Sequence, residues 1–257
     1  PVYGGINLED ISAPRCFEVE RRLRELLDIP VFHDDQHGTA IVVLAALRNA
    51  LKLVKKDISK VKIIMSGAGA AGTAIARLLV LSGATNIIAF DKDGVICKDS
   101  KSEDAMRAWF IENSNQTNFK GNIHEAMSGA DIFIGVSAPK VLDEADVASM
   151  APGSIVFALA NPDPEIDPAI ARKYAAVVAT GRSDHPNQIN NVLAFPGIFR
   201  GLLDAQAHKI TDKLLVAAAE AIADCVSPSQ LNTSFIVPSV FDPNVVSMVA
   251  AAVKKSV

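Results

Sequence analysis

The sequence predicts an α/β fold, in which a doubly wound parallel sheet is flanked by helices from a second lobe. The first observation is that short apolar runs alternate with helical patterns from residue 60 onward, as they do in repeated strand–helix–strand units. The second is the composition, since 49% of the 257 residues are hydrophobic but only 5% are aromatic, which suits helices packed on a buried parallel sheet. A chain of this length fits one large domain, or a main domain with a smaller appendage.

The first 59 residues are predicted to form a lobe of their own. Apolar residues recur at helical spacing over residues 15–27, after Pro14, which suits a first helical turn. Residues 30–33 have the pattern of a short strand. Residues 39–54 are so strongly apolar that we expect a mostly buried helix, which ends at the lysine pair that follows.

A second unit is predicted for residues 60–198, and the chain closes with helices over residues 199–257. The expected strands cover residues 61–65, 86–90, 132–136, 154–158 and 176–179, and the expected helices between them cover residues 70–81, 103–112 (from Glu103) and 143–150. The closing helices are expected at residues 199–207, 211–226 and 244–254. We expect them to pack back on the first lobe.

Composition and charge exclude several classes of function. Lys and Arg number 25 against 29 Asp and Glu, so the net charge is −4, and no basic stripe suggests a nucleic-acid partner. Cys16, Cys97 and Cys225 are far apart and form no CxxC pair, which argues against a disulfide framework and against a thiolate zinc site. The apolar stretch at residues 39–47 is followed by Arg48, so no run reaches the roughly 18 residues of a membrane helix. We therefore expect a cytoplasmic protein without a membrane partner.

A glycine-rich motif follows the first predicted strand of the second unit and opens the next predicted helix. In this context the glycines of a GxGxxG pattern allow a tight turn, close approach to a pyrophosphate and close helix–strand packing, while the helix N-terminus faces the phosphates. The alternative is a glycine turn in a Rossmann-like domain that binds nothing. The motif predicts a dinucleotide site formed by Gly67, Ala68, Gly69, Ala70, Ala71 and Gly72.

An acidic residue stands where a site of this kind binds the adenosine ribose. Asp91 ends the strand that follows, about 20 residues after Gly72, and its carboxylate can accept hydrogen bonds from the ribose hydroxyls. Lys92 comes next, and a basic neighbour can instead accommodate a 2′-phosphate. The expected cofactor is therefore NAD or NADP, with a preference for NAD.

Two further loops lie at the ends of predicted strands. Val136 and Ser137 close one strand, and Asn161 follows another, on the side where open α/β sheets bind ligands. These residues are candidates for cofactor or substrate contacts. Asn161 precedes a proline, and a turn residue explains it equally well.

Acidic residues flank the first predicted helix. Glu9 and Asp10 precede it, and Asp34 and Asp35 follow it. Oxygen ligands of this kind suit Mg²⁺ or Mn²⁺, which can share their remaining positions between water and substrate oxygens. Each acid is also explained as a solvated or capping residue, and residues 33–37 can simply be a helix start. The spacing alone leaves both interpretations open.

Longer motifs are more specific than the glycine pattern. The sequence reads GGINLEDI at residues 4–11, VFHDDQHGTA at residues 31–40 and TGRSDHPNQINN at residues 180–191, with shorter matches ANP at residues 160–162 and FPG at residues 195–197. In this combination, most of the chain resembles the malic enzymes of bacteria and archaea. The resemblance decides the interpretation of the acids in favour of a metal site.

Malic enzymes oxidise (S)-malate by hydride transfer to NAD or NADP and release CO₂ and pyruvate, with Mg²⁺ or Mn²⁺ as a Lewis acid. The resemblance implies that residues 1–59 belong to the metal and substrate lobe, that residues 60–198 are the NAD(P)-binding domain, and that the protein is a homodimer. His33 and His37 are interpreted as structural residues. The implied metal ligands are Glu9, Asp10 and Asp35, the implied substrate contacts are Asp34, Asn161 and Asn191, and the added cofactor contacts are Thr39, Asn161 and Asn190.

No residue of this sequence is assigned to proton transfer. Malic enzymes use a lysine as general base and a tyrosine as general acid, both upstream of the GGINLEDI motif, whereas this sequence opens at Pro1, just before that motif. Tyr3 and Tyr174 lack the flanking residues of the family's tyrosine. We therefore expect these 257 residues to bind NAD(P) and the metal but to turn over malate poorly without an upstream segment. The alternatives are oxaloacetate decarboxylation, malolactic conversion with a tightly held cofactor, or a non-catalytic nucleotide-binding domain.

Overall fold

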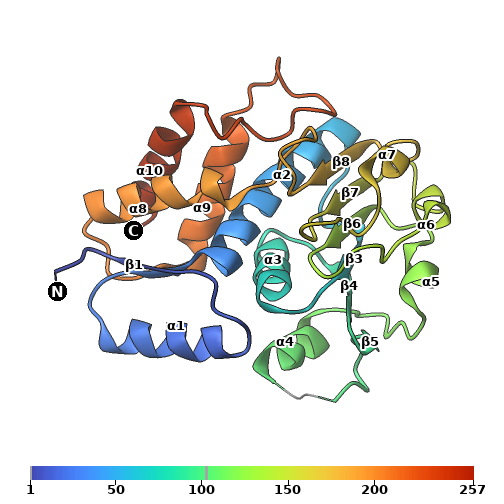
Figure 1. The fold of residues 1–257 in the computed structure, drawn as a ribbon, viewed down its shortest axis with the longest axis horizontal. Helices are drawn as coiled ribbons and strands as arrows, with labels where there is room; N and C mark the ends of the chain where they lie inside the picture. Colours follow the sequence, from blue (N-terminus) through green and yellow to red (C-terminus); the bar gives the residue numbers. More distant parts are fainter. Residues whose placement is uncertain (1, 102–103) are drawn as a thin grey trace.

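The computed structural model describes residues 2–101 and 104–257. Pro1, where the sequence opens, and Glu103, where a polar helix is predicted to begin, lie outside the described residues. Within those residues the central sheet has the strand order β5-β4-β3-β6-β7-β8, and β1 and β2 form a separate pair (Figure 1). The strands of the central sheet are β3 (Lys62–Ser66), β4 (Asn86–Asp91), β5 (Gly94–Val95), β6 (Ile132–Gly135), β7 (Ile155–Ala158) and β8 (Val177–Thr180).

Neighbouring strands of the central sheet run parallel, except for the short edge strand β5, which pairs antiparallel with β4. The chain passes from β3 to β4 on one side and then returns to β6 on the other side of β3. In sheets of this kind a ligand-binding crevice forms at the carboxyl ends of the strands where the order reverses. The predicted α/β fold is confirmed, and the reversal places the crevice at the ends of β3 and β6.

Helices cover both faces of the central sheet. The helices α2 (Thr39–Val54) and α3 (Ala70–Leu81) lie on one face, and α5 (Ile123–Met127), α6 (Glu144–Ala148) and α7 (Pro168–Ala171) lie on the other (Figure 1). Because side chains alternate along a strand, Ile63 and Met65 of β3 pack into the first layer, while Ile64 packs into the second. Burial on both faces explains why these strands appear in the sequence as continuous apolar runs.

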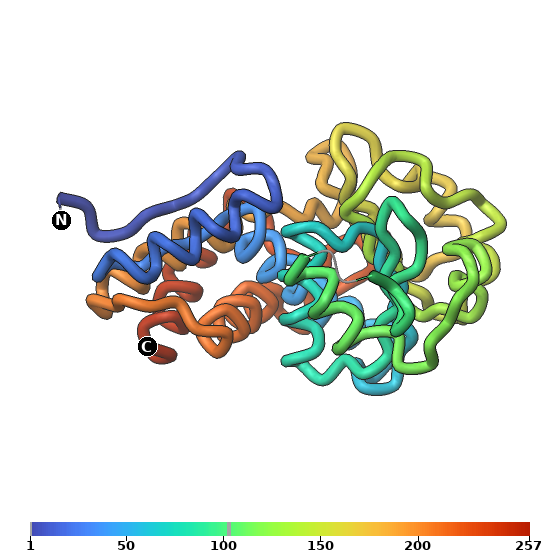
Figure 2. Tube along the Cα trace, turned by 90° about the horizontal axis from the view of Figure 1, so that it is seen from below, coloured from blue at the N-terminus to red at the C-terminus, as the bar shows by residue number. Residues whose placement is uncertain are grey.

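Segments from the two ends of the described chain lie together, away from the central sheet (Figure 2). There β1 (Ile6–Leu8) pairs in parallel with β2 (Val31–His33), and α1 (Arg15–Leu26) joins the two strands. The helices α8 (Phe195–Asp204), α9 (Asp212–Asp224) and α10 (Asn244–Ser256) pack together, and α9 also packs against α2. One hydrophobic core runs from these helices through α2 to the sheet. The division of the chain at residues 59 and 198 stays a prediction.

Some elements differ from the sequence prediction. The elements β1, β5, α5 and α7 were not expected, because each has only two to five residues and is too short to show a periodicity. Helix α8 begins at Phe195, earlier than expected, since Pro196 suits a first helical turn. Helix α4 (Ala105–Asn113) starts after Asp104, whose carboxylate accepts a hydrogen bond from the N–H of Arg107 at 2.8 Å.

Helix α2 has the predicted bounds, but an unexpected helical turn precedes it. A π-helical turn (Asp34–Gly38) continues directly into α2, and the combined segment is long and apolar enough to cross a membrane, judged by length and composition. From the sequence we expect no apolar run of this length, because the π-helical turn is not counted there as part of the helix. In the structure, 67% of the apolar window is buried inside the protein. Even Asn49 is fully buried, and its Nδ2 donates to the carbonyl oxygens of Ala223 and Ile236 at 2.9 Å each. Helix α2 is therefore a core helix that ties the sheet to α9.

Candidate functional site

The glycine motif forms the turn between β3 and α3. Gly67 has a φ of +107°, and a Cβ at this position would lie 2.7 Å from the carbonyl oxygen of Val136. A Cβ on Gly72 would overlap the carbonyl oxygen of Gly67, whereas a Cβ on Gly69 would meet no atom of the described residues within 4 Å. The first glycine therefore makes the turn, the third allows close packing of α3, and the second leaves the turn open to a ligand.

A cleft of about 890 Å³ lies at the carboxyl ends of β3, β4 and β6. Across it, the hydroxyl groups of Ser66 and Ser137 are hydrogen-bonded at 2.7 Å, which links the ends of β3 and β6. The structure thus gathers the predicted adenosine and pyrophosphate contacts at one edge of the sheet. The predicted cofactor residues that line the cleft are Gly67, Ala68, Gly69, Asp91, Lys92 and Ser137, while Ala70, Ala71 and Gly72 form the start of α3 and Val136 lies behind Gly67.

Two acidic pairs of the chain become neighbours because β1 and β2 run parallel side by side. The last residues of the two strands are paired, so Glu9 and Asp10, which follow β1, lie beside Asp34 and Asp35, which follow β2. We call these four residues the acidic cluster. The N–H of Asp10 donates to Oδ2 of Asp35 at 3.0 Å. The π-helical turn that begins with Asp34 packs against α3. The acidic cluster therefore lies next to the helix that starts at the glycine turn.

Asp34 is the buried member of the acidic cluster. Its Oδ2 accepts a hydrogen bond from the side-chain amide of Asn191, which comes from far along the chain. Its Oδ1 is buried without a partner among the described residues, and occupies the space left by the missing side chain of Gly38. Burial, together with the negative charges of Glu9 and Asp35, raises the pKa of Asp34 to about 6.

The acidic cluster fits a hard divalent cation by the chemistry of its donors. All of its side-chain donors are carboxylate oxygens, which Mg²⁺ and Mn²⁺ prefer. The buried Oδ1 of Asp34, which lacks a partner within the described chain, adds an acceptor beside them. The oxygens of the three predicted metal ligands, however, do not lie within 4.8 Å of one another. The fold thus brings the backbones of the two acidic pairs together without gathering the ligand oxygens.

A tighter group of ligating side chains occurs elsewhere in the described residues, at His124, Asp143 and Asp146. Its geometry is explained by the start of α6. Asp143 accepts a hydrogen bond from the N–H of Asp146, and Asp146 accepts one from the N–H of Asp143, which together form a capping box. His124 then approaches the Asp146 carboxylate at 2.8 Å. This group carries no signal of a ligand.

Glu20 of α1 holds the π-helical turn that carries Asp34 and Asp35. Its carboxylate lies 2.8 Å from Nε2 of His37 and accepts a hydrogen bond from Nε2 of Gln36 at 3.2 Å. Arg24 of the same helix pairs with it at 2.7 Å. Burial by itself raises the pKa of Glu20, but the hydrogen bond to His37 and the charges of His37 and Arg24 outweigh it, so the pKa lies below its ordinary value of 4.5. The ionised form of Glu20 therefore stabilises the folded protein.

Replacing Glu20 by glutamine is expected to lower the free energy of unfolding by about 1–3 kcal/mol at pH 7, because the variant loses charge-assisted hydrogen bonds. Since the folded pKa is lowered, this contribution is complete above pH 4.5 and is lost as the pH falls through the folded pKa. The difference between wild type and Glu20→Gln, measured by urea unfolding, should therefore shrink below pH 4.5. Glu25→Gln, on the exposed side of α1, is the matched control and should change little. A difference that stays constant from pH 7 to pH 3.5 would contradict this role.

The predicted amide residues lie at different places. Asn191 contacts the acidic cluster through Asp34, whereas Asn190 caps the short 3₁₀ turn Asn191–Leu193 by accepting the N–H of Val192 at 3.0 Å. Asn161 lies exposed in the loop after β7, and no hydrogen bond joins its side chain to the acidic cluster in the described chain. Thr39 is half-buried at the first position of α2.

Sequence reasoning missed Glu165, a fully buried acid beside the cleft. Its Oε1 accepts the N–H of Ser137 at 3.0 Å, and its Oε2 accepts the N–H of Ala160 at 3.1 Å. Burial raises the pKa of Glu165, and these backbone hydrogen bonds partly offset the rise. Glu165 thus ties together the loops that follow β6 and β7. The sequence offers no signal for it, because an acid in a polar loop is usually exposed.

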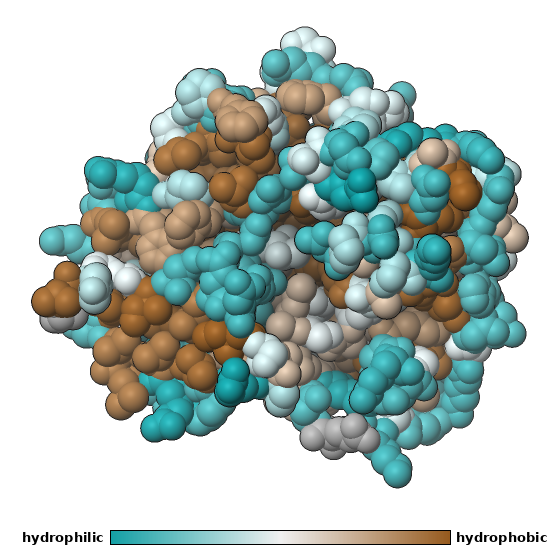
Figure 3. Space-filling view, in the orientation of Figure 1, coloured by the Kyte–Doolittle hydropathy of each residue, from teal (hydrophilic) through white to brown (hydrophobic). Residues whose placement is uncertain are grey.

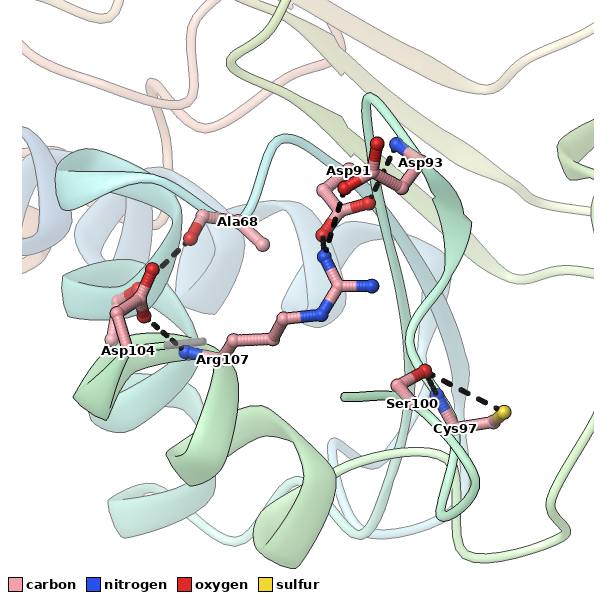
Figure 4. Close-up of polar contacts among 8 residues, drawn as sticks. Ala68, Asp91, Asp93, Cys97, Ser100, Asp104 and Arg107 are labelled. Carbon is pink, nitrogen blue, oxygen red and sulfur yellow. Dashed lines mark hydrogen bonds and ion pairs between the residues drawn. The ribbon is translucent and has the colours of Figure 1, made fainter. Parts of the chain in front are cut away.

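Arg107 was also missed, and it supplies a cation to Asp91, which lines the cleft at the end of β4. It belongs to α4 and forms an ion pair with Asp91 through Nη1 (Figure 4). In the sequence it stands in a short polar helix, where an arginine is ordinarily solvated. Only the tertiary structure, in which α4 packs against α3, brings Arg107 to Asp91.

Residues 36–257 match the family model described as malic enzyme, NAD binding domain. The chain is 55% identical to the NAD-dependent malic enzyme of Geobacillus stearothermophilus, over 98% of this chain and 53% of that protein. It is 49% identical to the bifunctional malic/malolactic enzyme of Bacillus subtilis, over 100% of this chain and 63% of that protein. The crystal structure of an NAD-dependent malic enzyme from Thermotoga maritima has a TM-score of 0.94 at 45% identity, over 99% of this chain and 67% of that one. The chain therefore spans between 53% and 63% of the length of these two curated relatives.

Proposed function

The chain belongs to the malic enzyme family, and from that premise we propose that its site serves the oxidative decarboxylation of (S)-malate to pyruvate and CO₂. NAD or NADP accepts the hydride, and Mg²⁺ or Mn²⁺ is the metal. The observation that carries the proposal is the acidic cluster next to the helix that starts at the dinucleotide cleft. Metal-assisted hydride transfer from a hydroxy acid needs both groups.

The residues of the acidic cluster divide into two roles. Glu9, Asp10 and Asp35 would hold the cation, which supplies a Lewis acid for the hydroxyl and carboxylate oxygens of malate. The hydrogen bond between Asp34 and Asn191 supports a substrate-side role for both, because it fixes the orientation of the amide. On the dinucleotide side, the buried carboxylate of Glu165 holds the loop that carries Ser137, which keeps the cleft in one shape.

Single-turnover chemistry tests this proposal. The protein, in excess, is incubated with (S)-malate, MnCl₂ and NAD or NADP, and NAD(P)H, pyruvate and lactate are quantified over time. Pyruvate and NAD(P)H should form in equal amounts. EDTA should stop both. Protein that binds NADH but forms neither product would contradict the proposal and favour a non-catalytic nucleotide-binding domain.

A malolactic reaction is the second candidate, and the 49% identity to the bifunctional malic/malolactic enzyme of Bacillus subtilis favours it. Both reactions would use the same acidic cluster and the same dinucleotide cleft. They differ in the fate of the hydride, which returns to pyruvate in the malolactic case. Lactate without free NAD(P)H would therefore identify this reaction, and pyruvate formed only from added oxaloacetate would identify a simple decarboxylase.

We also propose that the protein forms a homodimer and that it is located in the cytoplasm. Figure 3 shows that apolar surface gathers over the part of the molecule that contains α1 and β1, while much of the sheet side is hydrophilic. Tyr3 and Leu26 there are 73% and 72% exposed, and Leu203 of α8 is also exposed. A contiguous exposed apolar patch is typical of a protein–protein interaction site. Sedimentation equilibrium measures the mass of the assembly.

A further inference from the structure

At the end of β4, where the sheet would bind the adenosine ribose, both carboxylate oxygens of Asp91 are engaged. Oδ2 forms an ion pair with Nη1 of Arg107, and Oδ1 accepts the N–H of Asp93 at 2.9 Å. Nη1 of Arg107 also lies 3.4 Å from Oδ2 of Asp93. Figure 4 shows the side chain of Arg107 extending from α4 toward Asp91 and Asp93 at the end of β4. Asp91 and Asp93, which line this end of the cleft, are therefore paired with a cation that lies beside the cleft.

Arg107 is held in place and is not a mobile surface side chain. Its side chain is 16% exposed, and that of Asp91 is 17% exposed, so water screens the pair only weakly. Asp104 caps the helix and fixes the backbone of Arg107. Both ion pairs use Nη1, and Nε is buried without a partner in the part of the chain that the structure describes. The guanidinium thus retains donors beyond those given to the aspartates.

An aspartate at this position ordinarily selects NAD, because it accepts hydrogen bonds from the ribose hydroxyls and repels a 2′-phosphate. An arginine at this position ordinarily accommodates the 2′-phosphate. Here the two residues are paired, so the charge of Arg107 offsets that of Asp91. Exposed Lys92 lines the same cleft, as does Lys120, which pairs with Asp99. The cations at this end of the cleft offset the negative charge of Asp91 and Asp93 that would exclude NADP.

Resting on the proposed NAD(P) site, we propose that Arg107 is the residue that sets the selectivity between NAD and NADP. Its ion pair with Asp91 cancels the repulsion of a 2′-phosphate while it leaves the carboxylate near the ribose. The site then accepts either dinucleotide. Selectivity is determined by the Asp91–Arg107 pair and not by Asp91 alone.

Equilibrium binding of NADH and NADPH, followed by nucleotide fluorescence without metal or malate, tests the proposal. The readout is the ratio of the dissociation constant for NADPH to that for NADH. Wild type is expected to bind both. Arg107→Met should raise the ratio by about 10- to 100-fold, the effect of losing one charge-assisted interaction with a phosphate while freeing the charge of Asp91. Asp91→Asn should lower the ratio, and the double variant should return it toward wild type.

Arg48→Met is the matched control, because Arg48 of α2 pairs with Glu220 on another part of the molecule. Its ratio should equal that of wild type. Equal weakening of both nucleotides by Arg107→Met would show that the pair only ties α4 to the sheet, and would overturn the proposal. If that variant fails to fold, Asp91→Asn decides, since an unchanged ratio there has the same meaning. Wild type that binds neither dinucleotide would instead refute the proposed function of the cleft.

Discussion

Asp35→Ala is expected to lose Mn²⁺ binding by more than about 100-fold while it still binds NADH, because the variant removes a proposed ligand of the metal and not a wall of the dinucleotide cleft. The effect should be large for a second reason. Oδ2 of Asp35 accepts the N–H of Asp10 at 3.0 Å, so alanine also releases the loop that carries Glu9 and Asp10. One substitution therefore disturbs both halves of the acidic cluster.

Calorimetric titration with MnCl₂ measures this loss. Asp57→Ala is the matched control, since Asp57 is exposed in the turn after α2, at the opposite end of that helix from the acidic cluster. It should bind Mn²⁺ like wild type. Asp35→Asn keeps one oxygen acceptor and should bind more weakly than wild type but more tightly than the alanine variant. Mn²⁺ affinity that is the same in Asp35→Ala and wild type would exclude Asp35 as a ligand, and absence of binding in both would favour a nucleotide-binding domain without a metal.

The second large effect is expected at the glycine turn, where alanine substitutions at two glycines of the same motif should have different effects. Gly72→Ala places a Cβ into the carbonyl oxygen of Gly67, which is a backbone atom and cannot move aside like a flexible side chain. We expect the free energy of unfolding to fall by about 1–3 kcal/mol and NADH binding to be lost, because the turn must open to relieve the overlap. Gly69→Ala meets open space and has a φ of −80°, which alanine adopts freely.

Gly69→Ala should therefore keep the stability of wild type but weaken NADH binding about tenfold or more, because its methyl group enters the space through which a pyrophosphate approaches the helix N-terminus. Urea unfolding and NADH fluorescence titration separate the two effects. Equal NADH affinity in Gly69→Ala and wild type would mean that the dinucleotide does not cross this turn. Normal stability in Gly72→Ala would mean that the overlap is relieved without cost.

The sequence determined the sheet and its nucleotide-binding turn. The buried strands β3, β6 and β7 appear as continuous apolar runs, and the glycine motif lies between a strand and a helix. Each of these signals comes from consecutive residues, so it can be read without knowing what packs against them. Short elements such as β1 and α7 lack such a signal, since they are formed by their neighbours and not by their own periodicity.

The arrangement of the site residues depended on tertiary structure more than the sheet and the glycine turn did. Spacing alone left the acids undecided, and only the parallel pairing of β1 with β2 brings Asp10 to Asp35. Asn191 reaches Asp34 from the opposite part of the chain. The burial of Glu165 and the pairing of Arg107 have no local pattern at all. The physical reason is that the charge state and partners of an ionisable side chain depend on which distant segments exclude water from it, whereas helix and strand periodicity depends only on the residues that carry it.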